Sequence, residues 1–111
     1  MEFTNEMLEC LERAAQLTGG EWRTYIAHEN ESGVFYLRGR MKYWDPDNFN
    51  CLMQTAVLRG MNIETDRKGE IVVRARRLNL EVMEQVTDPH DYLDATKRAI
   101  LKLAIKLGRV P

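Results

Sequence analysis

The sequence predicts one α+β domain, in which three helices pack on an antiparallel sheet of four to five strands in the order α-β-β-α-β-β-(β)-α. Three observations predict it. Apolar residues recur every three or four positions in three segments, which is the period of a helix. In shorter segments they alternate with polar residues, which is the period of a strand. The 111 residues contain no low-complexity run or linker, so we expect residues 1–111 to form a single α/β domain.

The first helix is expected over residues 4–18. Acidic residues and Arg13 occupy one side of it, and apolar residues form a stripe on the other. The stripe consists of Phe3, Met7, Leu8, Leu11, Ala14 and Ala15. Gly19-Gly20 is expected to end the helix, because glycine adopts the left-handed conformation of a C-terminal cap without steric cost.

Two strands are expected next, over residues 22–28 and 34–43, with the turn-forming residues 29–33 between them. In the second strand apolar and mostly basic positions alternate, so they would lie on opposite faces. Gly39 lies inside this strand and indicates a bulge. The apolar set is Phe35, Leu37, Met41 and Tyr43, and the other set is Tyr36, Arg38, Arg40 and Lys42.

A second helix is expected to begin at Asp45 and to end at Gly60. Asp45 can cap the free backbone N–H groups of the first turn, and Pro46 suits the first helical position. A hairpin follows, with strands over residues 61–65 and 70–77.

Residues 78–86 either extend the preceding strand or form another one. Leu78, Leu80 and Val82 alternate with polar residues, which favours a strand. The last helix begins after Thr87-Asp88-Pro89 and is expected to end at Gly108. Its apolar stripe is wide, which indicates packing on a sheet and on a second surface. The expected core includes Leu52, Ala56, Ile63, Val73, Ala99 and Leu103.

The span from about Phe49 to Leu107 resembles the phage ABA sandwich domain family. The resemblance rests on Leu58-Arg59-Gly60 at the end of a helix, on the hairpin of residues 61–65 and 71–73, and on the closing helix of residues 91–103 with Ala95 and Ala99. It implies an α/β sandwich of phage or prophage origin. It implies no activity, because the family is defined by its fold.

Charge and hydropathy exclude some classes of protein. The chain has 16 Lys and Arg residues against 17 Asp and Glu residues, a net charge of −1. A near-neutral chain does not coat nucleic acid by bulk charge, although a local basic patch is compatible with it. Residues 1–6 lack the features of a signal peptide, and no segment approaches the ~18 apolar residues of a membrane span. We therefore expect a cytoplasmic protein that does not enter a membrane.

A basic strand face is the candidate binding site. Alternation places one basic set on one side of the second strand and another on one side of a later strand. If both strands share a sheet, these side chains form a cationic face that can bind an anionic partner. The residues are Arg38, Arg40, Lys42, Arg74 and Arg76, with Tyr36 among them. The alternative is a solvated face whose charges are neutralised by Glu64, Glu70 and Glu81 on neighbouring strands.

Trp44 precedes the second helix and is either a partner-facing aromatic or, as favoured for such a position, a core residue. The metal-ligating residue types are too widely spaced for a zinc site, so no metal or cofactor is expected. They are Cys10, His28, Cys51 and His90. The chain also lacks a glycine-rich phosphate loop and a nucleophile elbow.

The sequence is compatible with three functions. The favoured one is a small non-catalytic binding protein, a phage or prophage accessory factor that engages an acidic host component. The alternative is a nucleic-acid or nucleotide binder that uses the basic sheet face, and a small enzyme is disfavoured. The wide apolar stripe of the last helix also favours a homodimer.

Overall fold

The structure is a computed structural model that describes residues 4–17, 20–27, 30–37, 42–46, 48–66 and 72–109. It has the predicted α+β class, with three helices and a three-stranded antiparallel sheet packed against helices. The elements are α1 (Asn5–Ala14), β1 (Gly20–Ala27), β2 (Asn30–Leu37), β3 (Lys42–Trp44), α2 (Phe49–Leu58), β4 (Asn62–Asp66), β5 (Val72–Arg77), β6 (Leu80–Gln85), the 3-10 turn η1 (Pro89–Asp91) and α3 (Tyr92–Arg109). The single-domain organisation of residues 1–111 stays a prediction.

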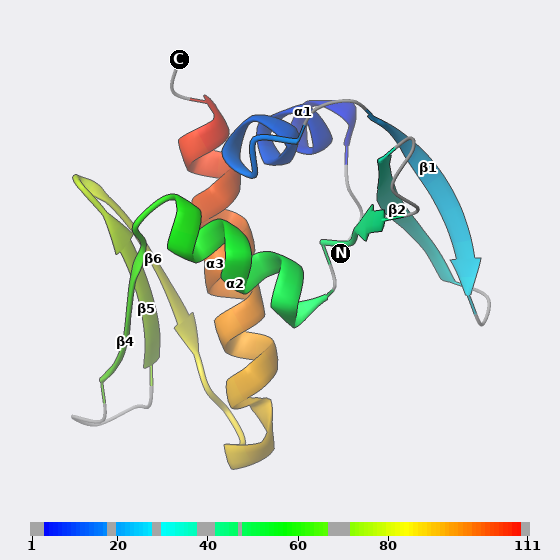
Figure 1. The fold of residues 1–111 in the computed structure, drawn as a ribbon. Helices are drawn as coiled ribbons and strands as arrows, with labels where there is room; N and C mark the ends of the chain where they lie inside the picture. Colours follow the sequence, from blue (N-terminus) through cyan, green and yellow to red (C-terminus); the bar gives the residue numbers. More distant parts are fainter. Residues whose placement is uncertain are drawn as a thin grey trace.

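The strands form two sheets, so the predicted sheet of four to five strands is wrong. One sheet has the order β1-β2-β3 and the other β4-β5-β6, and every pair is antiparallel. Figure 1 shows the two sheets on opposite sides of the helices. Alternation identifies a strand but not its neighbours, and here each strand pairs only with a strand that is adjacent in sequence.

α3 lies between the second sheet and the other two helices (Figure 1). On its sheet side the buried cluster consists of Val73, Ala75, Val82, Val86, Ala95, Ala99 and Leu103. On its helix side the cluster consists of Cys10, Leu11, Ala14, Trp44, Leu52, Ala56, Ile100, Leu101, Ala104 and Ile105. The prediction that the wide stripe packs on a sheet and on a second surface is confirmed. Of the expected core, only Ile63 is half-buried rather than buried.

The predicted strand over residues 34–43 folds back on itself. It contributes to β2 and β3, which pair through Leu37 and Lys42, and residues 38–41 between them lie outside the described residues, Gly39 with its expected bulge included. The expected loop 29–33 is likewise mostly strand, because β2 already begins at Asn30 opposite Ala27. Residues 80–85 form the separate strand that the alternation favoured, joined to β5 by Leu78 and Asn79.

Two of the predicted helix ends are confirmed. Gly60 has a φ of 64° just after α2, and the N–H groups of Gly60 and Met61 bond the carbonyl groups of Val57 and Ala56. Asp88 caps η1 by accepting a hydrogen bond of 2.8 Å from the backbone N–H of His90.

Three other predicted ends are wrong. α1 ends at Ala14 rather than at Gly19-Gly20, because Gln16 takes the left-handed conformation with a φ of 53°. α2 is capped by Asn48, whose side chain accepts from Cys51 N–H, while the carbonyl group of Asp45 accepts from Asn48 N–H in the preceding turn. Gly108 lies inside α3 rather than after it.

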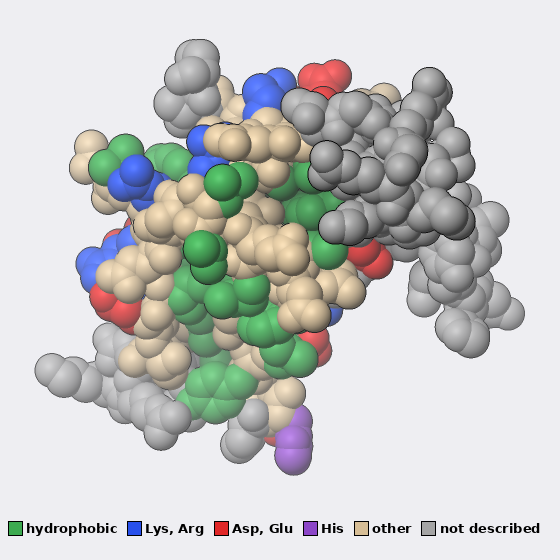
Figure 2. Space-filling model, viewed as in Figure 1, with side chains coloured by type: hydrophobic (Ala, Val, Ile, Leu, Met, Phe, Trp, Pro, Cys, Tyr) green, Lys and Arg blue, Asp and Glu red, His purple; other side chains and the backbone are tan. Residues whose placement is uncertain are grey.

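Figure 2 shows hydrophobic side chains along α2, in the middle of the face that is viewed, with charged side chains at its borders. α2 itself contains no charged residue. None of the helices in the described ranges is long and apolar enough to cross a membrane.

A candidate binding groove between β6 and α3

The two basic sets that the sequence analysis singled out do not meet in one sheet. Tyr36 and Lys42 lie on β2 and β3 of the first sheet, whereas Arg74 and Arg76 lie on β5 of the second. Arg38 and Arg40 lie outside the described residues. The condition for a shared cationic face, that both strands belong to one sheet, is therefore not met.

Arg74 and Arg76 face glutamates on the neighbouring strands. Arg74 Nε lies 2.9 Å from Glu81 Oε1 on β6, and Arg76 Nη2 lies 2.8 Å from Glu64 Oε1 on β4. Asn62 Nδ2 donates a further hydrogen bond of 2.9 Å to Glu64. The alternative, a solvated face with neutralised charges, predicted ion pairs to Glu64 and Glu81, and this part of the sheet carries mixed charge. The third glutamate of that reading, Glu70, lies outside the described residues.

The structure favours the core reading of Trp44. Its side chain is 5% exposed and belongs to the cluster that α1, α2 and α3 share. Of the candidate metal ligands, Cys10 is buried, Cys51 is half-buried and packs against the same cluster, and His90 is exposed, while His28 lies outside the described residues. Within the described ranges, no three His, Cys, Asp or Glu residues lie close enough to hold a metal ion.

A cationic stripe on α3 was missed by the sequence analysis, which considered only the apolar side of this helix. Arg98, Lys102, Lys106 and Arg109 follow one another at intervals of four, four and three residues. This spacing keeps side chains on one side of a helix. The same counting that identified the apolar stripe would have identified this one.

The lower, N-terminal half of the stripe consists of Arg98 and Lys102, and both are neutralised by ion pairs. Arg98 lies 3.2 Å from Asp91 Oδ2 and 3.4 Å from Glu84 Oε2, and Lys102 Nζ bonds Glu84 as well. The hydrogen bond to Asp91 is the largest of the effects that raise the pKa of the Arg98 guanidinium. Glu84 is largely covered, with 12% of its side chain exposed, so this half of the stripe is structural.

The upper, C-terminal half of the stripe consists of Lys106 and Arg109. Both side chains are exposed, and fewer carboxylates lie near them than near the lower half. Lys106 Nζ donates to the backbone carbonyl oxygen of Glu81 at 3.4 Å, which is a long hydrogen bond. Arg109 Nε lies 3.7 Å from Glu6 Oε1, and both side chains are more than half exposed. A long hydrogen bond and an exposed ion pair both contribute little to stability, so these two cations are available to a partner.

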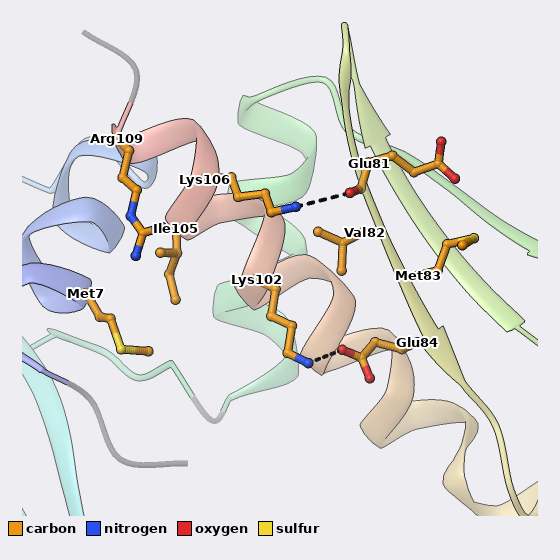
Figure 3. Close-up of a pocket in the computed structure, with 9 residues that line it drawn as sticks. All are labelled: Met7, Glu81, Val82, Met83, Glu84, Lys102, Ile105, Lys106 and Arg109. Atoms are coloured by element: carbon orange, nitrogen blue, oxygen red, sulfur yellow. Dashed lines mark hydrogen bonds and ion pairs between the residues drawn. The ribbon is translucent and has the colours of Figure 1, made fainter.

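The stripe borders an open groove along β6 (Figure 3). The groove has a volume of about 460 Å³, within the usual range of ligand clefts. Figure 3 shows Lys102 and Lys106 reaching from α3 toward β6, with Ile105 between α3 and α1. The lining residues are Met7, Glu81, Val82, Met83, Glu84, Lys102, Ile105, Lys106 and Arg109. The groove thus combines an apolar base with cations on its helical side.

No family model, curated protein or solved structure matches this chain. The resemblance to the phage ABA sandwich domain family therefore stays a prediction. Any function has to be inferred from the groove and its chemistry.

Proposed function

We propose that this protein is a non-catalytic binding protein that recognises an anionic surface of a protein partner through the groove between β6 and α3. The observation that carries the proposal is the exposure of the upper half of the cationic stripe. Lys106 and Arg109 are exposed beside an open apolar groove, and their contacts within the chain are long and accessible to solvent. Apolar base and charged rim are the usual composition of a protein-binding surface.

This proposal moves the binding site away from the sequence-predicted basic face. On the described part of that face, Arg74 and Arg76 each have a glutamate within 2.9 Å. A partner at that face would have to displace those glutamates, whereas a partner at the groove displaces one long hydrogen bond and one exposed ion pair. Cations at the groove also fit the acidic partner expected from the sequence.

The test compares two double variants that remove the same charge. Lys106→Gln/Arg109→Gln removes two positive charges from the groove, and Arg74→Gln/Arg76→Gln removes two from the sheet face. Binding of fluorescent poly-L-glutamate is measured at about 50 mM and about 200 mM salt, since electrostatic binding weakens with ionic strength. The groove variant is expected to lose most of the binding and most of its salt dependence, while the sheet variant binds as the unchanged protein does.

Two results would overturn the proposal. Equal binding by the groove variant and the unchanged protein would show that the groove is not the site. Tight binding of a single-stranded oligonucleotide that poly-L-glutamate does not displace would instead favour the nucleic-acid alternative, for which the salt slope reports the number of phosphates contacted.

The phage or prophage accessory role, the α/β sandwich of that family and the homodimer stay predictions. The homodimer was expected from the wide apolar stripe of the last helix. Most of that stripe is covered within the chain by the second sheet, α1 and α2, so it no longer favours self-association. Sedimentation velocity at high protein concentration decides between a monomer and a dimer.

A further inference from the structure

We infer that the partner segment binds as an added strand along β6, and that it is an extended peptide with acidic side chains at alternate positions. This inference rests on the proposed function, because it names what occupies the same groove.

β6 has one edge on which no described strand pairs with it. Among the described strands its only neighbour is β5, with which it forms a hairpin closed by the pair Arg77 and Leu80. Hydrogen-bonded and non-hydrogen-bonded pairs alternate in an antiparallel ladder, and the pair next to a two-residue loop is hydrogen-bonded. The N–H and C=O groups of Glu81 and Met83, the two such residues that line the groove, therefore point away from β5 toward the other edge.

Lys106 supports this assignment. Its Nζ donates to the backbone oxygen of Glu81, which requires that oxygen to point outward from β5. A lysine over a strand edge is a common way to protect the edge from unwanted pairing. At 3.4 Å the contact is long, so an incoming strand can replace it, and the released ammonium group can then pair with a carboxylate of that strand.

The space beside the edge has the shape for an extended segment. The groove is lined by four consecutive β6 residues, Glu81 to Glu84, and therefore follows the strand. Val82 and Glu84 point toward α3 and Met83 points away from it (Figure 3). A new strand about 4.8 Å from β6 would continue this alternation, since directly paired residues share a face of the sheet.

The side chains around the groove specify the chemistry of the segment. On the α3 face the added strand meets three cations, Lys102, Lys106 and Arg109, against one carboxylate, Glu84, which Lys102 already pairs. This excess of positive charge favours acidic residues at every second position. On the other face it meets Met83, which is 58% exposed, and this favours apolar residues in between. None of the described residues that line the groove is aromatic, so they do not form the stacking surface that single-stranded nucleic acids use.

The experiment uses a fluorescent peptide of about eight alternating glutamate and valine residues, the length of an ordinary strand. Two derivatives carry N-methyl groups, one on every valine and one on every glutamate. Because successive residues direct their N–H groups to opposite edges, only one derivative can lose its bonds to β6. We expect that derivative to bind at least about tenfold more weakly and the other to bind normally, which also reveals the strand direction.

Two matched pairs of protein variants test the same model. Met83→Pro removes an outward N–H group, whereas Met83→Ala removes the same side chain and keeps that group. Lys106→Glu reverses a charge at the groove, and Lys97→Glu makes the same change on α3 outside the lining residues. We expect Met83→Pro to bind about tenfold more weakly than Met83→Ala, and Lys106→Glu about tenfold more weakly than Lys97→Glu. Circular dichroism checks that each variant is folded.

The outcomes separate this inference from the proposed function. If both methylated peptides and Met83→Pro bind normally while Lys106→Glu does not, strand addition is wrong and the anionic-partner groove stands. If Lys106→Glu and Lys97→Glu bind equally well, both proposals are wrong. A dimer without peptide that Met83→Pro dissociates and Met83→Ala does not would make a second copy the occupant and overturn the acidic peptide. Failure of Met83→Pro to fold leaves the methylated peptides to decide.

Discussion

Gln16 shows how a single residue sets the end of a helix. It has a φ of 53°, where side chains with a Cβ are disfavoured, and it is exposed to solvent. The backbone around it forms a C-terminal cap, because the N–H groups of Gln16 and Leu17 bond the carbonyl groups of Arg13 and Glu12. The backbone conformation at this position therefore favours glycine, although the residue is glutamine.

Gln16→Gly is expected to stabilise the protein by about 0.5–1 kcal/mol, because glycine relieves the cost of the left-handed conformation. Gln16→Ala keeps the Cβ and serves as the matched control, with no gain expected. Urea unfolding followed by circular dichroism measures both free energies. A gain for alanine as large as that for glycine would mean that Gln16 is not left-handed.

At Gly108 it is the lack of space for a side chain, and not the backbone dihedral angles, that requires glycine. It lies inside α3 where α1 crosses, and a Cβ added there would lie 1.9 Å from the backbone oxygen of Cys10. Arg13 Nε donates a hydrogen bond of 2.6 Å to the carbonyl oxygen of Gly108, which ties the same crossing together. The two helices could not approach this closely with any larger residue at this position.

Gly108→Ala distinguishes packing from helix propensity by the sign of its effect. In an exposed helix interior alanine is more stable than glycine by about 1 kcal/mol. At this crossing we expect a loss of about 1–3 kcal/mol, because α1 has to move away from α3. Thermal and urea unfolding measure the change. Stabilisation by alanine would contradict the close contact between the helices.

At the scale of elements, Arg59 connects the end of α2 to the end of α1. Its Nε donates to the carbonyl oxygen of Ala14 at 2.7 Å and its Nη2 to that of Arg13 at 2.6 Å. The last carbonyl groups of a helix have no partner within the helix, and a cation there also interacts favourably with the helix dipole. Arg59 thus completes α1 from a position 45 residues further along the chain.

Arg59→Met is expected to lower the free energy of unfolding by about 1–2 kcal/mol, because two charge-assisted hydrogen bonds are lost and the aliphatic stem is kept. Arg59→Lys keeps the charge but cannot reproduce the two-pronged geometry, so it should recover only part of the loss. Equilibrium unfolding of the three proteins gives the comparison. If methionine were tolerated without loss, solvent would have to satisfy the end of α1 equally well.

At the scale of the whole molecule, α3 is the element on which the second sheet, α1 and α2 assemble. Leu103 lies on its sheet side, is fully buried and belongs to the same cluster as Val73 and Ala99. The fold of these parts therefore depends on one helix that is apolar on two sides.

Leu103→Ala is expected to cost about 2–5 kcal/mol, the range for a buried leucine that leaves a cavity. Leu93→Ala on the same helix is the control, because Leu93 is 53% exposed and should lose less than about 0.5 kcal/mol. A melt followed by circular dichroism reports both. Equal melting temperatures for the two variants would contradict the orientation of α3.

Local chemistry allowed several features to be predicted. The class, the three helices, the hairpin of β4 and β5 and the caps at Gly60 and Asp88 follow from apolar period and from residues with particular backbone preferences. The end of α1 was missed because a left-handed glutamine leaves no sign in the sequence. The groove was missed because its parts come from α1, β6 and α3, which no local pattern joins.

The sequence by itself determined which residues form helices and strands and which side of each is apolar, since these depend on neighbours within a few positions. Only the tertiary structure decided that the strands form two sheets, that Arg74 and Arg76 face glutamates, and that Lys106 lies over the edge of β6. These depend on which faces meet, and that choice is made by the packing of the whole chain around α3. The distribution of charge on the folded surface, and with it the candidate site, is a consequence of that packing.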